Sequence, residues 1–258
     1  MMNAILSDPV VRPSASLAKL ASITDFRLYV SLTFDSLLHS ALVTAGRGKP
    51  ADIAQVGYAP REMPRRDLPD QVRNLPFPLV YHLLGRHSAL PEFVISEDDL
   101  LEYIVGLQSE SSPARLLDEL KGHSLLFLSG NFPDWLLRML LRLTKQRRLS
   151  LPRDTPGAIE VLADSHSRSS SSLTAFLGDF SPQTKVYDTN AASFIDELHT
   201  RWRERRGEVE PAASAADFVF LSYTREDREA GLASCCVPKR RRPCSTRYAI
   251  RRGSAARS

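Results

Sequence analysis

The sequence predicts an α/β fold in which helices cover both faces of a parallel sheet. Apolar runs of strand length alternate along the chain with segments of helical periodicity, and this alternation is typical of parallel sheets. With 258 residues, 43% of them hydrophobic, the chain is long enough to bury one core of good size and part of a second.

Caps, glycines and prolines place the boundaries of the predicted elements. In chain order we expect helix 14–23, strand 26–33, helix 35–45, strand 53–58, strand 79–84, helices 96–107 and 112–121, strand 124–129, helix 133–146, strand 158–162, helix 173–179, strand 185–187, helix 191–206 and strand 217–223. Several helix starts carry residues that suit the unpaired first N–H groups: Ser14 or Ser16, Asp35, Ser96, Pro113 and Pro133. Residues 46–77, rich in proline, glycine and charge, predict an irregular connection.

The apolar positions of helix 133–146 predict which of its side chains face the sheet. Leu136, Met139, Leu140 and Leu143 repeat at spacings of three and four. Trp135 lies beside this series, so we expect its indole to be largely buried.

The positive charge is confined to the C-terminal end. The net charge is +4, but residues 234–258 hold eight basic residues and no acidic one, which leaves 26 basic against 30 acidic residues elsewhere. All three cysteines, Cys235, Cys236 and Cys244, lie in this segment, so no disulfide framework is expected. The abrupt, aperiodic onset is typical of a frameshift or a misplaced gene end and predicts a disordered tail. The alternative is a basic arm that binds nucleic acid or a membrane.

The sequence shows no clear signal for membrane insertion or export. The longest apolar runs fall short of the roughly 18 residues that a membrane span needs. Residues 1–11 lack the basic and apolar regions of a signal peptide. We therefore expect a cytoplasmic protein.

Three segments outline a nucleotide site. They are Val-Tyr-His-Leu-Leu-Gly at 80–85, Ser-Glu-Asp-Asp-Leu at 96–100 and Leu-Phe-Leu-Ser-Gly-Asn-Phe-Pro-Asp-Trp at 126–135. In the third, a strand passes through a glycine turn into a helix start, the arrangement by which a parallel sheet presents N–H groups to a phosphate or ribose. Gly130 and Asn131 line an adenosine pocket on this interpretation; alternatively, Gly130 only ends a strand.

These segments, in this order, resemble the sirtuin-like NAD-binding domains of bacterial defence proteins. The resemblance covers roughly residues 14–205, and the stretch Gly-x-x-x-Asp-Trp-x-x-Arg at 130–138 is its most specific part. It implies a Rossmann-like sheet that binds NAD through Gly85, Gly130, Asn131 and Asp134, and cleavage of the glycosidic bond of NAD. We accordingly expect a component of anti-phage defence.

Three departures from that family pattern predict a degenerate, catalytically inactive domain. Thr33 stands where the family has asparagine, and Leu84 stands where its His-Gly pair has histidine. No glycine precedes Thr33 to form the pyrophosphate loop, so we expect a sheet that is incomplete at its N-terminus. The candidate catalytic residues are Thr33, Asp35 and His82. Asp35 either caps its helix or contacts a ribose hydroxyl, and His82 is either structural or catalytic.

A second resemblance begins at Asp217. The run Asp-Phe-Val-Phe-Leu-Ser-Tyr-Thr-Arg-Glu-Asp-Arg-Glu-Ala looks like the opening strand and first loop of a Toll/interleukin receptor (TIR) domain, without that family's downstream catalytic glutamate. The expected organisation is an N-terminal extension 1–13, a sirtuin-like domain 14–206, a linker 207–216, a TIR-like fragment of a second α/β domain at 217–233 and the basic tail 234–258. A lone strand cannot bury its apolar faces, so it docks on the first domain, pairs with another chain or stays loosely ordered.

The expected function is that of a regulatory or assembly module for a TIR effector, with TIR or sirtuin-like chains, copies of itself included, as partners. The alternatives are an NAD hydrolase of sirtuin-like or TIR type and a nucleic-acid-binding protein that acts through the tail. No metal is expected, because Glu97, Asp98 and Asp99 fit a helix start better than a metal cluster.

Overall fold

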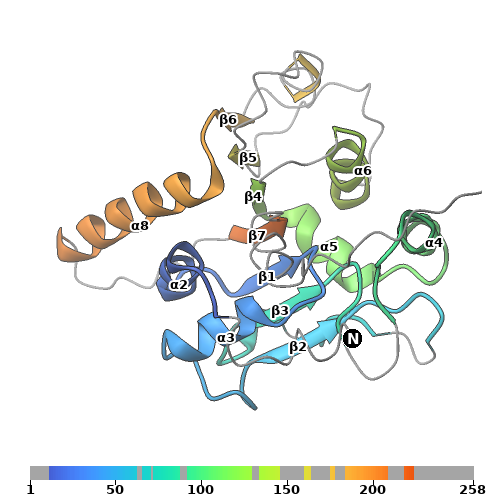
Figure 1. Cartoon of the computed structure of the whole chain (residues 1–258), viewed down its shortest axis with the longest axis horizontal. Coiled ribbons are helices and arrows are strands. Elements are labelled where there is room, and N and C mark those ends of the chain that lie inside the picture. The colour runs from blue at the N-terminus through green and yellow to red at the C-terminus, as the bar shows by residue number, and fades with distance from the viewer. Residues whose placement is uncertain are drawn as a thin grey trace, which may run out of the picture.

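Seven parallel strands form one sheet (Figure 1). This computed structural model describes residues 12–62, 66–70, 72–87, 92–129, 134–145, 160–163, 175–177, 184–208 and 218–223. The strands are β1 (Leu28–Ser31), β2 (Ala54–Gly57), β3 (Leu79–His82), β4 (Ser124–Ser129), β5 (Glu160–Ala163), β6 (Lys185–Tyr187) and β7 (Phe218–Tyr223). Their order is β2-β3-β1-β7-β4-β5-β6, and the strands pair in parallel throughout. The predicted α/β class is confirmed.

The helices follow the predicted positions, and their caps explain where they start. They are α2 (Ala15–Ser22), α3 (Leu37–Thr44), α4 (Glu97–Gln108), α5 (Ala114–Gly122), α6 (Asp134–Lys145) and α8 (Ala191–Glu208), with the short 3-10 helix η1 (Val72–Asn74). The Ser14 hydroxyl accepts a hydrogen bond from the N–H of Leu17 at 3.2 Å. Ser96 and Asp99 form a reciprocal capping box at the start of α4. Asp99 therefore serves the helix start, as predicted.

Side chains alternate between the two faces of the sheet and build two cores. One core joins α2, α3 and α8 to the sheet through Tyr29, Val80, Leu126 and Leu128. The other joins α4, α5 and α6 to the opposite face through Leu28, Val30, Leu79, Tyr81, Leu125 and Phe127. Because helices cover both faces, the central strands β1 and β3 are buried throughout, and their nearly continuous apolar sequences follow from this burial. The outer strands β2 and β6 are partly exposed.

The last strand in the sequence lies in the middle of the sheet. β7 pairs with β1 from Leu28↔Val219 to Ser31↔Ser222, and with β4 from Ser124↔Phe218 to Ser129↔Tyr223. Of the three fates open to this strand, the structure shows docking on the first domain. Residues 224–233 lie outside the described residues, so a second domain beginning at 217 stays a prediction.

The prediction that Trp135 is buried is wrong. Its side chain is 49% exposed, whereas Leu136, Leu137, Leu140 and Leu141 are buried against the sheet. At about 100° per residue, Trp135 lies roughly 170° around α6 from the centre of this leucine stripe. The buried face runs through 137 and 141 in place of 139 and 143, which turns the indole away from the core.

Other predictions fall on parts of the chain that lie outside the described residues. These parts include 1–11, 130–133, 209–217 and 224–258. The extension, the linker and the basic tail therefore stay predictions. Within the described residues, the helices are too short or too polar to cross a membrane.

Candidate functional site

The predicted site residues follow the carboxyl ends of the strands. Strands of a parallel sheet all end at the same edge, where ligands bind in open α/β folds. Thr33 and Asp35 follow β1, and His82 ends β3 beside it, in register with Ser31. Asp134 is the first residue of α6, beyond the end of β4. Gly130 and Asn131 lie outside the described residues.

His82 is fully buried and both of its ring nitrogens have partners. Nδ1 lies 3.0 Å from the carbonyl oxygen of Thr33, and Nε2 lies 3.3 Å from Oε1 of Gln55 on β2. Burial lowers the pKa of His82, so the ring is neutral at physiological pH. A neutral imidazole has one N–H donor and one acceptor nitrogen. Both contacts are satisfied when Nδ1–H donates to the Thr33 carbonyl and Nε2 accepts from the NH₂ group of Gln55, whose amide is then in the flipped orientation. His82 therefore ties β3 to its two neighbours.

The turn after β1 is closed by its own hydrogen bonds. The Ser31 hydroxyl lies 2.9 Å from Oγ1 of Thr33 and accepts from the Thr33 N–H at 3.2 Å. Asp35 accepts a hydrogen bond from the N–H of Leu37 at 2.9 Å through Oδ1 and so satisfies the first N–H of α3, although Ser36 is the N-cap residue. Thr33 and Asp35 are thus held in place by local contacts.

Gly85 is required by a close approach of two backbone segments. Its φ is +82°, and a Cβ there would lie 2.2 Å from the carbonyl oxygen of Glu92 and 2.6 Å from Cα of Phe93. Gly85 and Phe93 form an isolated antiparallel bridge. Leu84, which stands at the position of the family's histidine, is buried in the core that includes Tyr103.

A cluster of aromatic rings lies beside Gly85 and was not predicted from the sequence. The ring of Phe93 lies 5.0 Å from Phe34 and 5.5 Å from His87, measured between centroids. The N–H of His87 donates to the carbonyl of Phe34 at 2.8 Å, which joins the segments that follow β3 and β1. Phe34 follows the end of β1, and His87 follows the end of β3. The bridge between Gly85 and Phe93 brings the third ring to them.

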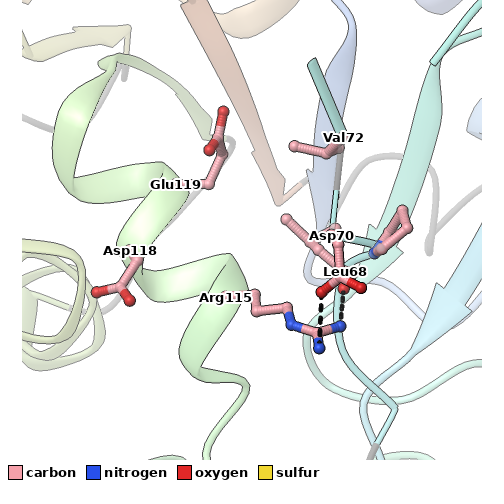
Figure 2. A pocket seen from close by; sticks show the side chains of 7 residues that line it. Leu68, Asp70, Val72, Arg115, Asp118 and Glu119 are labelled. Carbon is pink, nitrogen blue, oxygen red and sulfur yellow. Dashed lines mark hydrogen bonds and ion pairs between the residues drawn. The ribbon is translucent and has the colours of Figure 1, made fainter. Parts of the chain in front are cut away.

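A pocket lies between α5 and the loop that holds Leu68 and Asp70 (Figure 2). Its volume is about 290 Å³. Arg115 forms an ion pair with Asp70 at 2.8 Å and donates to the carbonyl of Leu68 at 3.0 Å. Asp118 and Glu119 add two further acidic groups to the lining. Because acidic side chains outnumber the one arginine, this pocket does not suit a pyrophosphate.

The loop beside that pocket has a structural role. Both oxygens of Asp67 accept from the first backbone N–H groups of α5, those of Arg115 at 2.8 Å and Leu116 at 3.1 Å. The carboxylate thereby caps the helix from a distant part of the chain. The ion pair between Arg115 and Asp70 in Figure 2 adds a second link between this loop and α5.

The parallel sheet with helices on both faces is a Rossmann-like α/β fold. Residues 27–172 match the family model of the SIR2-like domain. This match spans more than half of the 258 residues, and the chain belongs to that family. No curated protein and no solved structure matches the chain.

The described residues at this edge are engaged by contacts within the fold. Both ring nitrogens of the buried His82 have partners, Asp35 accepts from the first N–H of α3, and Leu84 is a core residue. Within the described part of the chain, no group of three or more His, Cys, Asp or Glu residues is placed to hold a metal ion. Contacts of NAD with Gly85 and with the start of α6 stay a proposal.

Proposed function

We propose that this chain is a catalytically inactive sirtuin-like module of a bacterial defence protein, with a regulatory or assembly role. The observation that carries this proposal is the environment of His82. A general base must reach the proton that it removes and must be free to accept it. The His82 ring is buried and both of its nitrogens have partners, on Thr33 and Gln55, which supports a structural role for this residue.

The neighbouring substitutions support the same proposal. Leucine at position 84 has no titratable group, and its side chain packs in the core. Threonine at position 33 is shorter than asparagine and is engaged by Ser31. A retained role in binding NAD would use the proposed contacts Gly85, Gly130, Asn131 and Asp134.

The proposed partners are a TIR-bearing chain or another sirtuin-like chain. This part rests on the resemblance of residues 217–230 to the opening of a TIR domain. Residues 218–223 form β7, the central strand of this sheet. A partner that binds this segment would therefore contact β7. The alternative of nucleic-acid binding depends on residues 234–258 and predicts salt-dependent retention of DNA that is lost when they are removed.

The test is the loss of NAD with the purified full chain. We expect no turnover above a heat-inactivated sample, and no gain in the double variant Leu84→His with Thr33→Asn, because the pyrophosphate loop is missing from the sequence before Thr33. His199→Ala on α8 serves as the matched histidine control for His82→Ala. Turnover that His82→Ala abolishes and His199→Ala preserves would establish the NAD hydrolase alternative.

A further inference from the structure

The sheet depends on a strand from outside the family-matched segment. β7 begins at Phe218, whereas the match to the SIR2-like domain ends at residue 172. Removing β7 from the strand order leaves two separate groups, β2-β3-β1 and β4-β5-β6. The core of a family domain is thus closed by a segment whose sequence resembles the start of a different domain.

The path of the chain explains how this strand reaches the middle of the sheet. α8 is fixed on α2 by an ion pair between Lys19 and Asp196 at 3.0 Å, and by a hydrogen bond from the Trp202 indole to Asp25. Asp25 lies between α2 and β1, three residues before Leu28, so this contact places α8 near the amino end of β1. β7 starts at that same end, where Val219 is in register with Leu28. Residues 209–217 connect α8 to β7, and nine residues span up to about 30 Å.

We infer that the space between β1 and β4 is a strand-binding site, and that this chain's own residues 218–223 occupy it as a separable segment. An empty site would leave the facing N–H and C=O groups of β1 and β4 without partners inside a doubly covered sheet, which is costly. The sequence on either side of β7 does not have to be part of the sheet for the strand to fill the site.

Occupation of this site also controls the candidate ligand edge. Thr33 and Asp35 follow β1 on one side of β7, and α6 follows β4 on the other. The two halves of the edge lie beside each other only while β7 joins them. A partner that withdraws residues 218–223 would therefore separate the halves, whether or not NAD binds there.

The first test is amide hydrogen exchange on the intact chain. Amides of Val219, Phe220 and Leu221 should be protected to the same extent as those of Leu126 and Phe127, their neighbours on β4. Rapid exchange of the β7 amides in a protein whose β4 amides are protected would overturn the inference. In the variant Phe220→Pro, which removes a central ladder donor, β1 and β4 should lose protection, whereas Ala249→Pro in the tail should change neither.

The second test separates the strand from the domain. A protease site inserted between residues 209 and 216 of the full chain is cut after folding, and the products are analysed by size-exclusion chromatography. The fragment that contains β7 should stay with the domain and leave only on denaturation. A control site at 233–234 should release its tail fragment without denaturant.

Two results of that experiment would contradict the inference. Loss of the β7 fragment from a domain that stays folded would show that the site does not need the strand. Retention of the fragment in a particle of twice the mass, with cross-linking between copies, would show that a second copy supplies the strand. Retention at monomer mass supports the assignment to the chain's own segment.

Discussion

The substitution Gly85→Ala tests the close backbone approach at the end of β3. A Cβ at this position would lie 2.2 Å from the Glu92 carbonyl oxygen, 2.6 Å from Cα of Phe93 and 2.8 Å from the Tyr103 hydroxyl. Two of these three neighbours are backbone atoms, which cannot turn aside as a flexible side chain does. The φ of +82° adds the strain of a left-handed conformation.

Gly46→Ala is the matched control for this substitution. Gly46 has a φ of +72°, but no atom lies within 4 Å of the place where its Cβ would be. Alanine at 46 should therefore cost only the backbone strain, about 1–2 kcal/mol. Alanine at 85 carries the same strain plus about 1–3 kcal/mol for overpacking, so a total of about 2–5 kcal/mol is expected.

Urea denaturation followed by circular dichroism measures both variants against the parent. A Gly85→Ala midpoint well below that of Gly46→Ala, or insoluble Gly85→Ala beside soluble Gly46→Ala, is the expected result. Equal losses at the two positions would show that the segment 92–93 moves aside without cost. The bridge between Gly85 and Phe93 would then not hold the candidate edge in shape.

Four further predictions follow from other parts of the molecule. Trp135→Ala should cost less than about 1 kcal/mol in urea denaturation, while Leu140→Ala on the buried face of the same helix should cost about 2–5 kcal/mol; comparable losses would contradict the exposed position of Trp135. Because burial lowers the folded-state pKa of His82 below the ordinary value of 6.5, its contribution to stability is complete above that pH and is lost as the pH falls through the folded-state pKa. The urea midpoint of His82→Gln should accordingly fall less between about pH 7.5 and pH 5.5 than that of the parent, and an equal fall in both proteins would count against the buried neutral ring. Hydrogen bonds from the Ser96 backbone and hydroxyl lower the pKa of Asp99, so Asp99→Ala should cost about 1 kcal/mol at neutral pH, and no loss would argue against the capping box. Limited trypsin digestion should cut residues 239–252 first and leave a fragment that extends at least to about residue 200, and protection of those basic sites would argue against a disordered tail.

The candidate site shows that a match to a family's sequence pattern does not by itself give the contacts of the matching residues. The substitution of leucine for histidine at position 84 is visible in the sequence alone. The contacts of His82 with Thr33 and Gln55, which lie 49 and 27 residues away in the chain, are visible only in the structure. His82 lies near the position of the expected histidine in the sequence, but its buried and hydrogen-bonded ring is less accessible than that proximity suggests.

Local signals in the sequence were sufficient to locate the helices and strands. Serine and aspartate caps, the glycine after α3 and the alternation of apolar runs depend on contacts within one turn or one strand, so they can be read without the fold. The same signals established the parallel α/β class, because strands separated by helices leave few other arrangements.

Tertiary structure alone decided the position of β7, the partners of His82 and the exposed face of α6. The sequence of a strand does not specify which neighbours it pairs with. Residues 218–223 are equally consistent with the start of another domain, and only their pairing with β1 and β4 in the structure places them in this sheet. Helical periodicity defines an apolar stripe only to within the width of a side chain, so the sheet determined whether the stripe ran through 137 and 141 or through 139 and 143. All three features come from contacts between residues far apart in the chain, where burial and hydrogen bonding outweigh local preference.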